Sequence, residues 1–195
     1  MDFRHKALNL LTQIIPYRGG FWRFATAAST AFALTGCISS TGPVLSDAKP
    51  VLGERGLIHA FTLSQGAAHD PEVVSFQWSG SRYLVRGKSI GYSEFTAHPY
   101  EGRDWIVQAT TQRAPHRTEY GLARKLADGV YQLVAINEND AEAPAREKFC
   151  TKTQDASCRI ATPEQLFVFA RASADKPMEG GGLAVVVPGD NGAKR

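Results

Sequence analysis

Short extended runs, separated by turn residues, dominate this chain between residues 57 and 136 and limit the folds open to it. They recur every ~9–14 residues, a spacing typical of antiparallel sheets. In the clearest run, Val74, Phe76 and Trp78 alternate with polar residues. The pattern predicts a mainly β domain, built as an antiparallel meander, a sandwich or a small barrel.

The expected strands share apolar alternation bounded by turn residues, and they are residues 57–64, 73–78, 83–86, 92–97, 105–110, 120–126, 130–136 and 183–187. Asp128-Gly129 lies between two of them and is a strong hairpin signal, because a type I′ turn needs positive φ at both central residues. We expect the run before Pro99 to end ahead of that residue, since proline cannot donate to a ladder. The last run is too hydrophobic to stay unpaired, so it is expected to join the sheet.

One helix is expected near the C-terminus, packed on the sheet. Thr162 can cap it, Pro163 suits its first position, and Gln165 is placed to reach back to the cap. An apolar stripe then continues to about Ala174. Residues 137–148 are polar and are expected to form a loop with some helix.

The first 36 residues have the composition of an export signal. Four basic residues and one acid precede an uncharged, Ala-rich run of about eleven residues, too short for the roughly twenty that span a bilayer as a helix. A basic start, a short apolar stretch and small residues before a cleavage point are the parts of a secretory signal.

The run ends in Leu34-Thr35-Gly36-Cys37, which resembles the lipobox of bacterial lipoprotein signal peptides. The resemblance implies cleavage before Cys37, lipid attachment to its thiol and a membrane anchor in the bacterial cell envelope. Ile38 follows the cysteine where lipoproteins kept in the inner membrane often carry Asp, so the resemblance implies the outer membrane, facing the periplasm. The alternatives are a simple secretory signal, or a buried helix with a chance cysteine.

The remaining chain divides into a flexible tether over residues 37–51, one β-rich domain over residues 52–188 and a disordered tail over residues 189–195. Ser, Gly and Pro without periodicity indicate the tether. After the signal is removed, 18 basic residues balance 18 acidic ones, because the whole chain has 22 and 19 and the signal holds four and one. This balance excludes the electrostatic footprint of a nucleic-acid-binding domain.

Cys150 and Cys158 are the two cysteines left over. Their C-x₇-C spacing matches neither zinc nor thioredoxin motifs, and exported proteins keep disulfides. We expect a structural disulfide between them; free thiols or a metal site are the alternatives.

No known catalytic motif occurs, and no cofactor or metal is expected. His98, Glu101, Arg103 and Asp104 bring acid–base types to one bend. Residues of this kind at a turn are ordinarily solvated, so no catalytic role is assigned. The aromatic residues are expected to be mostly core, with the remainder lining a face or mouth that stacks on a ligand; they are Trp78, Tyr83, Tyr92, Phe95, Tyr100, Trp105, Tyr120 and Tyr131.

The sequence therefore favours a non-enzymatic, membrane-anchored lipoprotein whose β domain binds or scaffolds an envelope protein or cell-wall component. Two alternatives stay open: an envelope hydrolase using His98 with Glu101 or Asp104, and a carrier that holds a lipid or small molecule in a barrel cavity.

Overall fold

A computed structural model describes residues 38–64, 67–68, 71–87, 91–112, 114, 116–152, 158–175 and 182–189. The signal segment, Cys37 and residues 190–195 lie outside the described residues, so the lipid attachment and the disordered tail stay predictions.

Eight strands close into an antiparallel barrel, which confirms the mainly β fold class and selects the barrel among the predicted forms. Around the ring they are β8 (Thr118–Ala127), β7 (Asp104–Thr111), β6 (Tyr92–Pro99), β5 (Tyr83–Arg86), β4 (Glu72–Trp78), β2 (Arg55–Ser64), β12 (Gly182–Pro188) and β9 (Val130–Ala135). Pairing of β8 with β9 closes the ring, and each neighbouring pair is antiparallel. The two-residue strand β3 (Ala67–Ala68) pairs only with β2.

Alternation along the strands separates a lumen face from an outer face. In β4, Val74 and Phe76 are buried in the lumen, whereas Val73 and Ser75, which alternate with them, are exposed. The Asp128-Gly129 turn joins β8 to β9 as a hairpin, as expected, but of its two central residues Gly129 alone has positive φ (+71°), so the turn is not of type I′. A Cβ at this glycine would lie 2.9 Å from the carbonyl oxygen of Val186, so both the backbone and the space require glycine.

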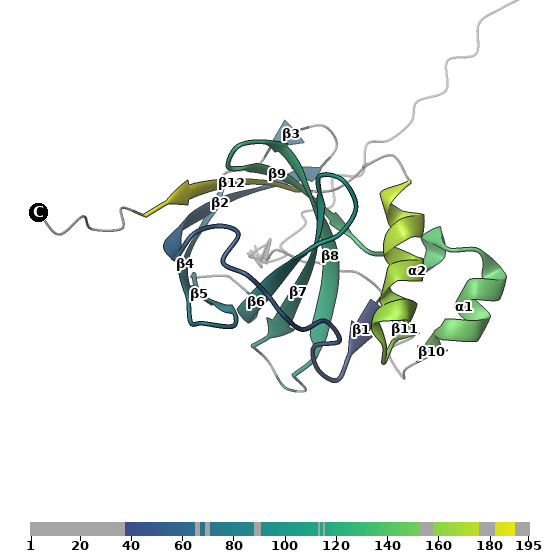
Figure 1. Ribbon diagram of the computed structural model, residues 1–195. Coiled ribbons are helices and arrows are strands. Elements are labelled where there is room, and N and C mark those ends of the chain that lie inside the picture. Colours follow the sequence, from purple (N-terminus) through teal and green to yellow (C-terminus); the bar gives the residue numbers. More distant parts are fainter. Residues whose placement is uncertain are drawn as a thin grey trace, which may run out of the picture.

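Between β9 and β12 the chain leaves the barrel and forms a helical side layer, in which β1 (Ile38–Ser40) also takes part. The elements are η1 (Glu138–Asp140), α1 (Ala143–Phe149), β10 (Thr151–Lys152), β11 (Cys158–Arg159) and α2 (Pro163–Ala174). Figure 1 shows α2 beside β8 and β1, with α1 farther out and β12, β2 and β4 on the opposite side of the barrel. The predicted helix is confirmed with its capping box of Thr162 and Gln165.

A core of almost fully buried side chains lies outside the barrel, between α2 and the wall. Leu166 and Phe169 of α2 are fully buried against Ile106 of β7 and Leu122 of β8. Tyr120 joins this cluster from the outer face of β8, and burial raises the pKa of its hydroxyl. The barrel is thus stabilised from one side by a helix rather than from the lumen alone.

The predicted tether is wrong over residues 38–51, which pack on the domain. Strand β1 is buried and pairs antiparallel with β8 and parallel with β11. The backbone N–H groups of Val44 and Leu45 donate to Oε1 of Gln108, at 3.0 and 2.8 Å. The partners that order this segment come from strands far along the chain, and local composition does not reveal them.

Strand β6 is longer than predicted, because it includes Pro99. Pro99 pairs with Trp105 of β7, while β5 reaches only Phe95 and Glu94 of β6. The proline therefore lies where the strand has no barrel neighbour on its β5 side, and its missing N–H group breaks no ladder there. The apolar run near the C-terminus pairs on both sides, with β2 and β9, as expected.

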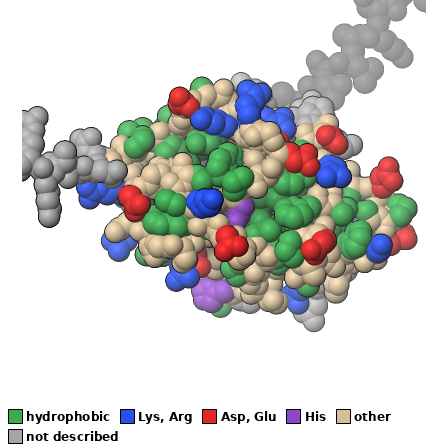
Figure 2. Space-filling view, viewed as in Figure 1, with side chains coloured by type: hydrophobic (Ala, Val, Ile, Leu, Met, Phe, Trp, Pro, Cys, Tyr) green, Lys and Arg blue, Asp and Glu red, His purple; other side chains and the backbone are tan. Residues whose placement is uncertain are grey.

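Charged side chains of both signs are interspersed over the face shown in Figure 2, with apolar groups between them. No large area of one sign is seen on this face, in agreement with the balanced charge of the domain. In the part of the chain that the structure describes, no helix has the length and apolarity needed to cross a bilayer.

Candidate binding site

The barrel lumen contains a cavity of about 110 Å³ whose lining surface is wholly apolar. It is lined by inward-facing side chains from the barrel strands and by two residues that precede β2: Val51, Leu52, Ile58, Val74, Val85, Tyr92, Phe95, Ala97, Trp105, Val107, Ala109, Ala123, Tyr131, Leu133, Ala184 and Val186. An eight-stranded barrel has an interior just wide enough for side chains to fill, or to hold one small ligand. The residues at these positions decide which of the two occurs.

Alanine at four inward positions leaves the space open. Ala97, Ala109, Ala123 and Ala184 lie on β6, β7, β8 and β12, and all four line the cavity. A leucine or phenylalanine at such a position would extend into the lumen, whereas a methyl group stops at the wall. The alanine pattern therefore creates a void that ordinary core packing would fill.

On β7 and β9, the larger side chains of the cavity wall are only half-buried although they face inward. Trp105 and Val107 of β7 and Tyr131 and Leu133 of β9 all have this intermediate exposure. Their counterparts on the outer side of the wall, such as Ile106 and Leu122, are almost completely buried under α2. The lumen is therefore the less densely packed side of the barrel wall.

Leu52 and Tyr83 close the lumen near the start of β2. The backbone N–H of Leu52 donates to the hydroxyl of Tyr83 at 2.8 Å. Burial raises the pKa of Tyr83 to about 12, so this phenol stays protonated. Its ring stacks on Phe95, which lines the cavity, at 4.9 Å and meets Phe76 edge-on at 5.4 Å, so an aromatic cluster supports this part of the cavity wall.

The structure places His98 on the outer face of β6, beneath the segment that precedes β2. Its Nε2 lies 2.9 Å from Oγ1 of Thr96 and 2.9 Å from Nε2 of Gln108. Burial lowers the pKa of His98, so the ring is neutral at pH 7. His98 therefore belongs to the polar cluster that holds residues 43–48 on the barrel.

Glu101 and Asp104 contact other residues than His98. Glu101 is exposed and pairs with Arg171 of α2 at 3.2 Å. Asp104 is buried and accepts two hydrogen bonds from Arg124, at 2.8 and 2.7 Å, which raise the pKa of that guanidinium. The hydrolase alternative would pair His98 with one of these carboxylates, whereas the structure holds the three side chains by different neighbours.

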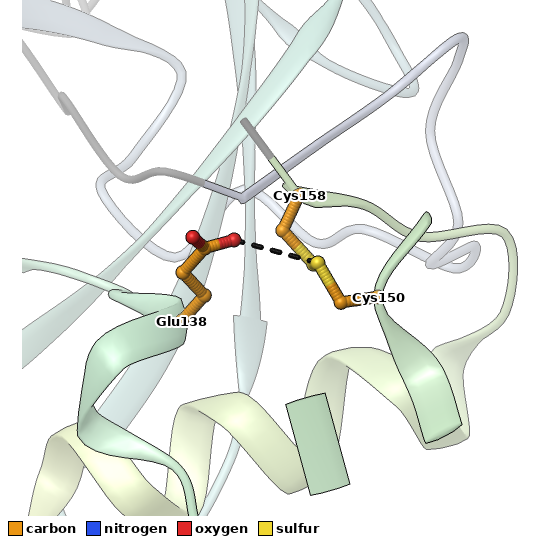
Figure 3. A group of neighbouring side chains, drawn as sticks. All are labelled: Glu138, Cys150 and Cys158. Atoms are coloured by element: carbon orange, nitrogen blue, oxygen red, sulfur yellow. Dashed lines mark hydrogen bonds between the residues drawn. A yellow bond between two sulfur atoms is a disulfide. The ribbon is translucent and has the colours of Figure 1, made fainter. Parts of the chain in front are cut away.

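The structure contains the disulfide between Cys150 and Cys158, with their Cα atoms 5.1 Å apart. It joins the end of α1 to β11, where Cys158 is fully buried beside β1. Glu138 of η1 directs a carboxylate oxygen to within 3.4 Å of Sγ of Cys150 (Figure 3). The three side chains have the spacing of a metal site, but sulfur atoms bonded to each other lack the thiolate charge that binds metal ions.

Sequence reasoning found part of this lumen site and missed its central feature. Four of the aromatic residues singled out above line the cavity: Tyr92, Phe95, Trp105 and Tyr131. The four alanines of the cavity wall were not predicted as site residues, because the alanine side chain has no functional group that indicates a role. These alanines indicate a cavity because all four point into the lumen. This can be recognised only when it is known which side of each strand faces the lumen.

Comparison with protein-family models, with curated proteins and with solved structures finds no match to this chain.

Proposed function

We propose that this protein is a binding barrel that holds a small apolar molecule, or the apolar part of a larger one, in its lumen. A single observation supports this most directly: a closed barrel retains a cavity lined only by apolar groups, although the same strands pack densely on their other side. The carrier reading of the sequence is thereby favoured over a scaffold that acts through its outer surface alone.

The size of the cavity indicates the kind of ligand. An engineered apolar cavity of about 150 Å³ stays dry and binds benzene. At about 110 Å³, this lumen suits a group no larger than benzene, such as a small ring or a short stretch of alkyl chain. By the cavity scale of about 24 cal/mol per Å³, leaving it empty costs roughly 2–3 kcal/mol, which a bound ligand recovers in part.

The proposal includes the localisation in the bacterial cell envelope that the resemblance to a lipobox implies. Acylation of Cys37 would hold the barrel at a membrane, where alkyl chains are abundant. The disulfide supports export, because such bonds persist in oxidising compartments and are rare in the cytosol. The ligand would then be an apolar component of the envelope or a molecule in transit through it.

Filling the lumen tests the proposal. Benzene should raise the Tm of the native protein, since a ligand that binds only the folded state stabilises it. Ala123→Phe places a ring in the cavity and should abolish this rise. The matched control is Ala127→Phe, the same change at an exposed position of the same strand, and it should keep the response.

Two further measurements secure the result. Should Ala123→Phe fail to fold, Ala97→Leu fills the same lumen with a smaller group. Mass spectrometry of organic extracts from the purified native protein should reveal a co-purifying apolar molecule that Ala123→Phe lacks. An unchanged Tm at saturating benzene, together with empty extracts, would rule out the proposed function.

A further inference from the structure

Glu72 is a carboxylate on the lumen face of the barrel. In β4, positions 72, 74 and 76 share one side, and Val74 and Phe76 are buried in the lumen. Glu72 is also directly opposite Ala60 of β2. Ala60 is in turn opposite Ala184 of β12, a residue of the cavity wall. Glu72 therefore shares the inward side of β4 with Val74, which lines the cavity, although Glu72 itself is not one of the lining residues.

The carboxylate has no partner among the residues that the structure describes. Both of its oxygen atoms are buried, and neither accepts a hydrogen bond. Asp104 shows the ordinary arrangement, since its buried carboxylate is held by two hydrogen bonds from Arg124. A buried acid without such bonds is costly, and native proteins retain few of them without a reason.

We infer that Glu72 binds the head group of the lumen ligand, and that this head group is an amine. The inference rests on the proposed function and adds the ligand class to it: an amphipathic amine with a short apolar part. Val74, two residues along the strand from Glu72, lines the cavity, and two residues span about 6.6 Å in a strand. A chain of a few carbon atoms is long enough to fill the lumen while its ammonium group meets the carboxylate.

The charge and the hydrogen-bonding capacity of the Glu72 carboxylate both favour an amine as the ligand's head group. A carboxylate only accepts hydrogen bonds, and an ammonium group offers three donors with the opposite charge. A charge-assisted hydrogen bond in a buried site contributes enough to change affinity by about tenfold or more. A ligand carboxylate at the same place would face a like charge and would be rejected.

Three probes of equal chain length test the inference: pentylamine, pentanol and pentanoate, titrated into the native protein by calorimetry at pH 7. The native protein should bind pentylamine at least about tenfold more tightly than pentanoate. Glu72→Gln keeps the shape of the side chain and removes its charge, so this preference should vanish while pentanol affinity changes little. Glu147→Gln, on the exposed surface of α1, is the matched control and should keep the preference.

The unliganded Tm gives an independent measurement. Removing the charge of an unpaired buried carboxylate should leave the Tm of Glu72→Gln equal to that of the native protein or raise it by several degrees. A Tm clearly below the native value would mean that the carboxylate has a structural partner, and would overturn the inference.

The outcomes separate the two proposals. If neither benzene nor any pentyl probe binds the native protein, the proposed function itself is wrong. If benzene binds but pentylamine and pentanoate bind equally well, the lumen is a binding site and only the role of Glu72 is wrong.

Discussion

At the scale of single residues, Gln108 and His98 hold residues 43–48 on the outside of the barrel through hydrogen bonds. Oε1 of Gln108 accepts hydrogen bonds from the backbone N–H groups of Val44 and Leu45. The two hydrogens of its amide nitrogen are shared among three atoms within hydrogen-bonding distance, which belong to Leu45, Thr96 and His98. His98 also hydrogen-bonds to the backbone of Ser46. A neutral imidazole can serve as acceptor and donor at once in such a cluster, whereas an imidazolium can only donate.

The state of His98 predicts a dependence of stability on pH. Burial holds the folded-state pKa below its ordinary value of 6.5, although Ser46 and Asp47 act in the opposite direction. Between these two pKa values the unfolded chain binds a proton that the folded chain does not, so protonation favours unfolding. The contribution of His98 is therefore constant above about pH 6.5 and is lost as the pH falls below that value.

We expect the Tm of the native protein to fall as the pH drops below about 6.5, and His98→Gln to flatten that part of the profile. His116 is exposed, so His116→Gln serves as the control and should leave the slope unchanged. A slope that persists in His98→Gln would assign the effect to other groups.

The same residues show why the sequence could not decide for or against the hydrolase alternative. His98, Glu101 and Asp104 are close in sequence, but proximity along a chain does not determine which face of a strand a side chain takes. The partners of His98 lie in the segment before β2 and on β7, and those of the two acids lie on α2 and β8. The cysteines were more predictable, because only two remained once Cys37 was set aside.

At the scale of elements, local signals were sufficient for the barrel strands and for α2. Alternation, Asp-Gly and a capping box act over a few residues, so they can be read without knowledge of the fold. Strand β1 and the short strands β10 and β11 lack such signals. They exist because β8 presents an edge to β1, and β1 in turn presents one to β11.

Helix α2 offers a matched pair of phenylalanines for testing where the main core lies. Phe169 is fully buried against the outer wall of the barrel, whereas Phe167 is 38% exposed and stacks on Tyr100. Phe169→Ala should lower the free energy of unfolding by about 3–5 kcal/mol, the range for a large core deletion. Phe167→Ala should cost about 1–2 kcal/mol, since most of its loss is one aromatic contact.

Urea unfolding followed by far-UV circular dichroism measures both values. Equal losses from the two variants would contradict a core centred between α2 and the barrel wall. A loss from Phe169→Ala of under about 1 kcal/mol would do the same, since core deletions of this size cost several times more.

At the scale of the whole molecule, the barrel has a dense side and an open side. The cluster under α2 supplies packing that does not depend on the lumen, and the lumen residues are therefore free to leave a cavity. Sequence patterns predicted the strands that enclose this cavity. They did not predict that the inward side chains leave space between them. Whether a lumen is filled depends on the sizes of side chains from all eight strands at once.

The proposed acyl anchor also concerns the whole molecule, because it would determine the distance between the barrel and a membrane. Ile38, the residue after Cys37, is already buried in β1 between β8 and β11. If Cys37 is acylated, no spacer separates the acylated residue from the folded domain. The barrel would then lie close to the bilayer, within reach of apolar molecules that leave it.

Changing Cys37 to alanine tests this arrangement. Cys37→Ala should move the protein from the membrane fraction to the soluble fraction of fractionated cells, because a multi-chain acyl anchor holds firmly and its loss leaves nothing comparable. The Tm of the soluble protein should match that of the anchored one, since β1 begins after the changed residue. The control is the double change Cys150→Ala and Cys158→Ala, which should stay with the membrane while its Tm falls.

Mass spectrometry of the native protein should find Cys37 at the N-terminus with acyl chains attached. Retention of Cys37→Ala in the membrane fraction, or a native chain that still carries its first 36 residues, would remove the envelope localisation from the proposal and leave the lumen site to be judged by its ligands alone.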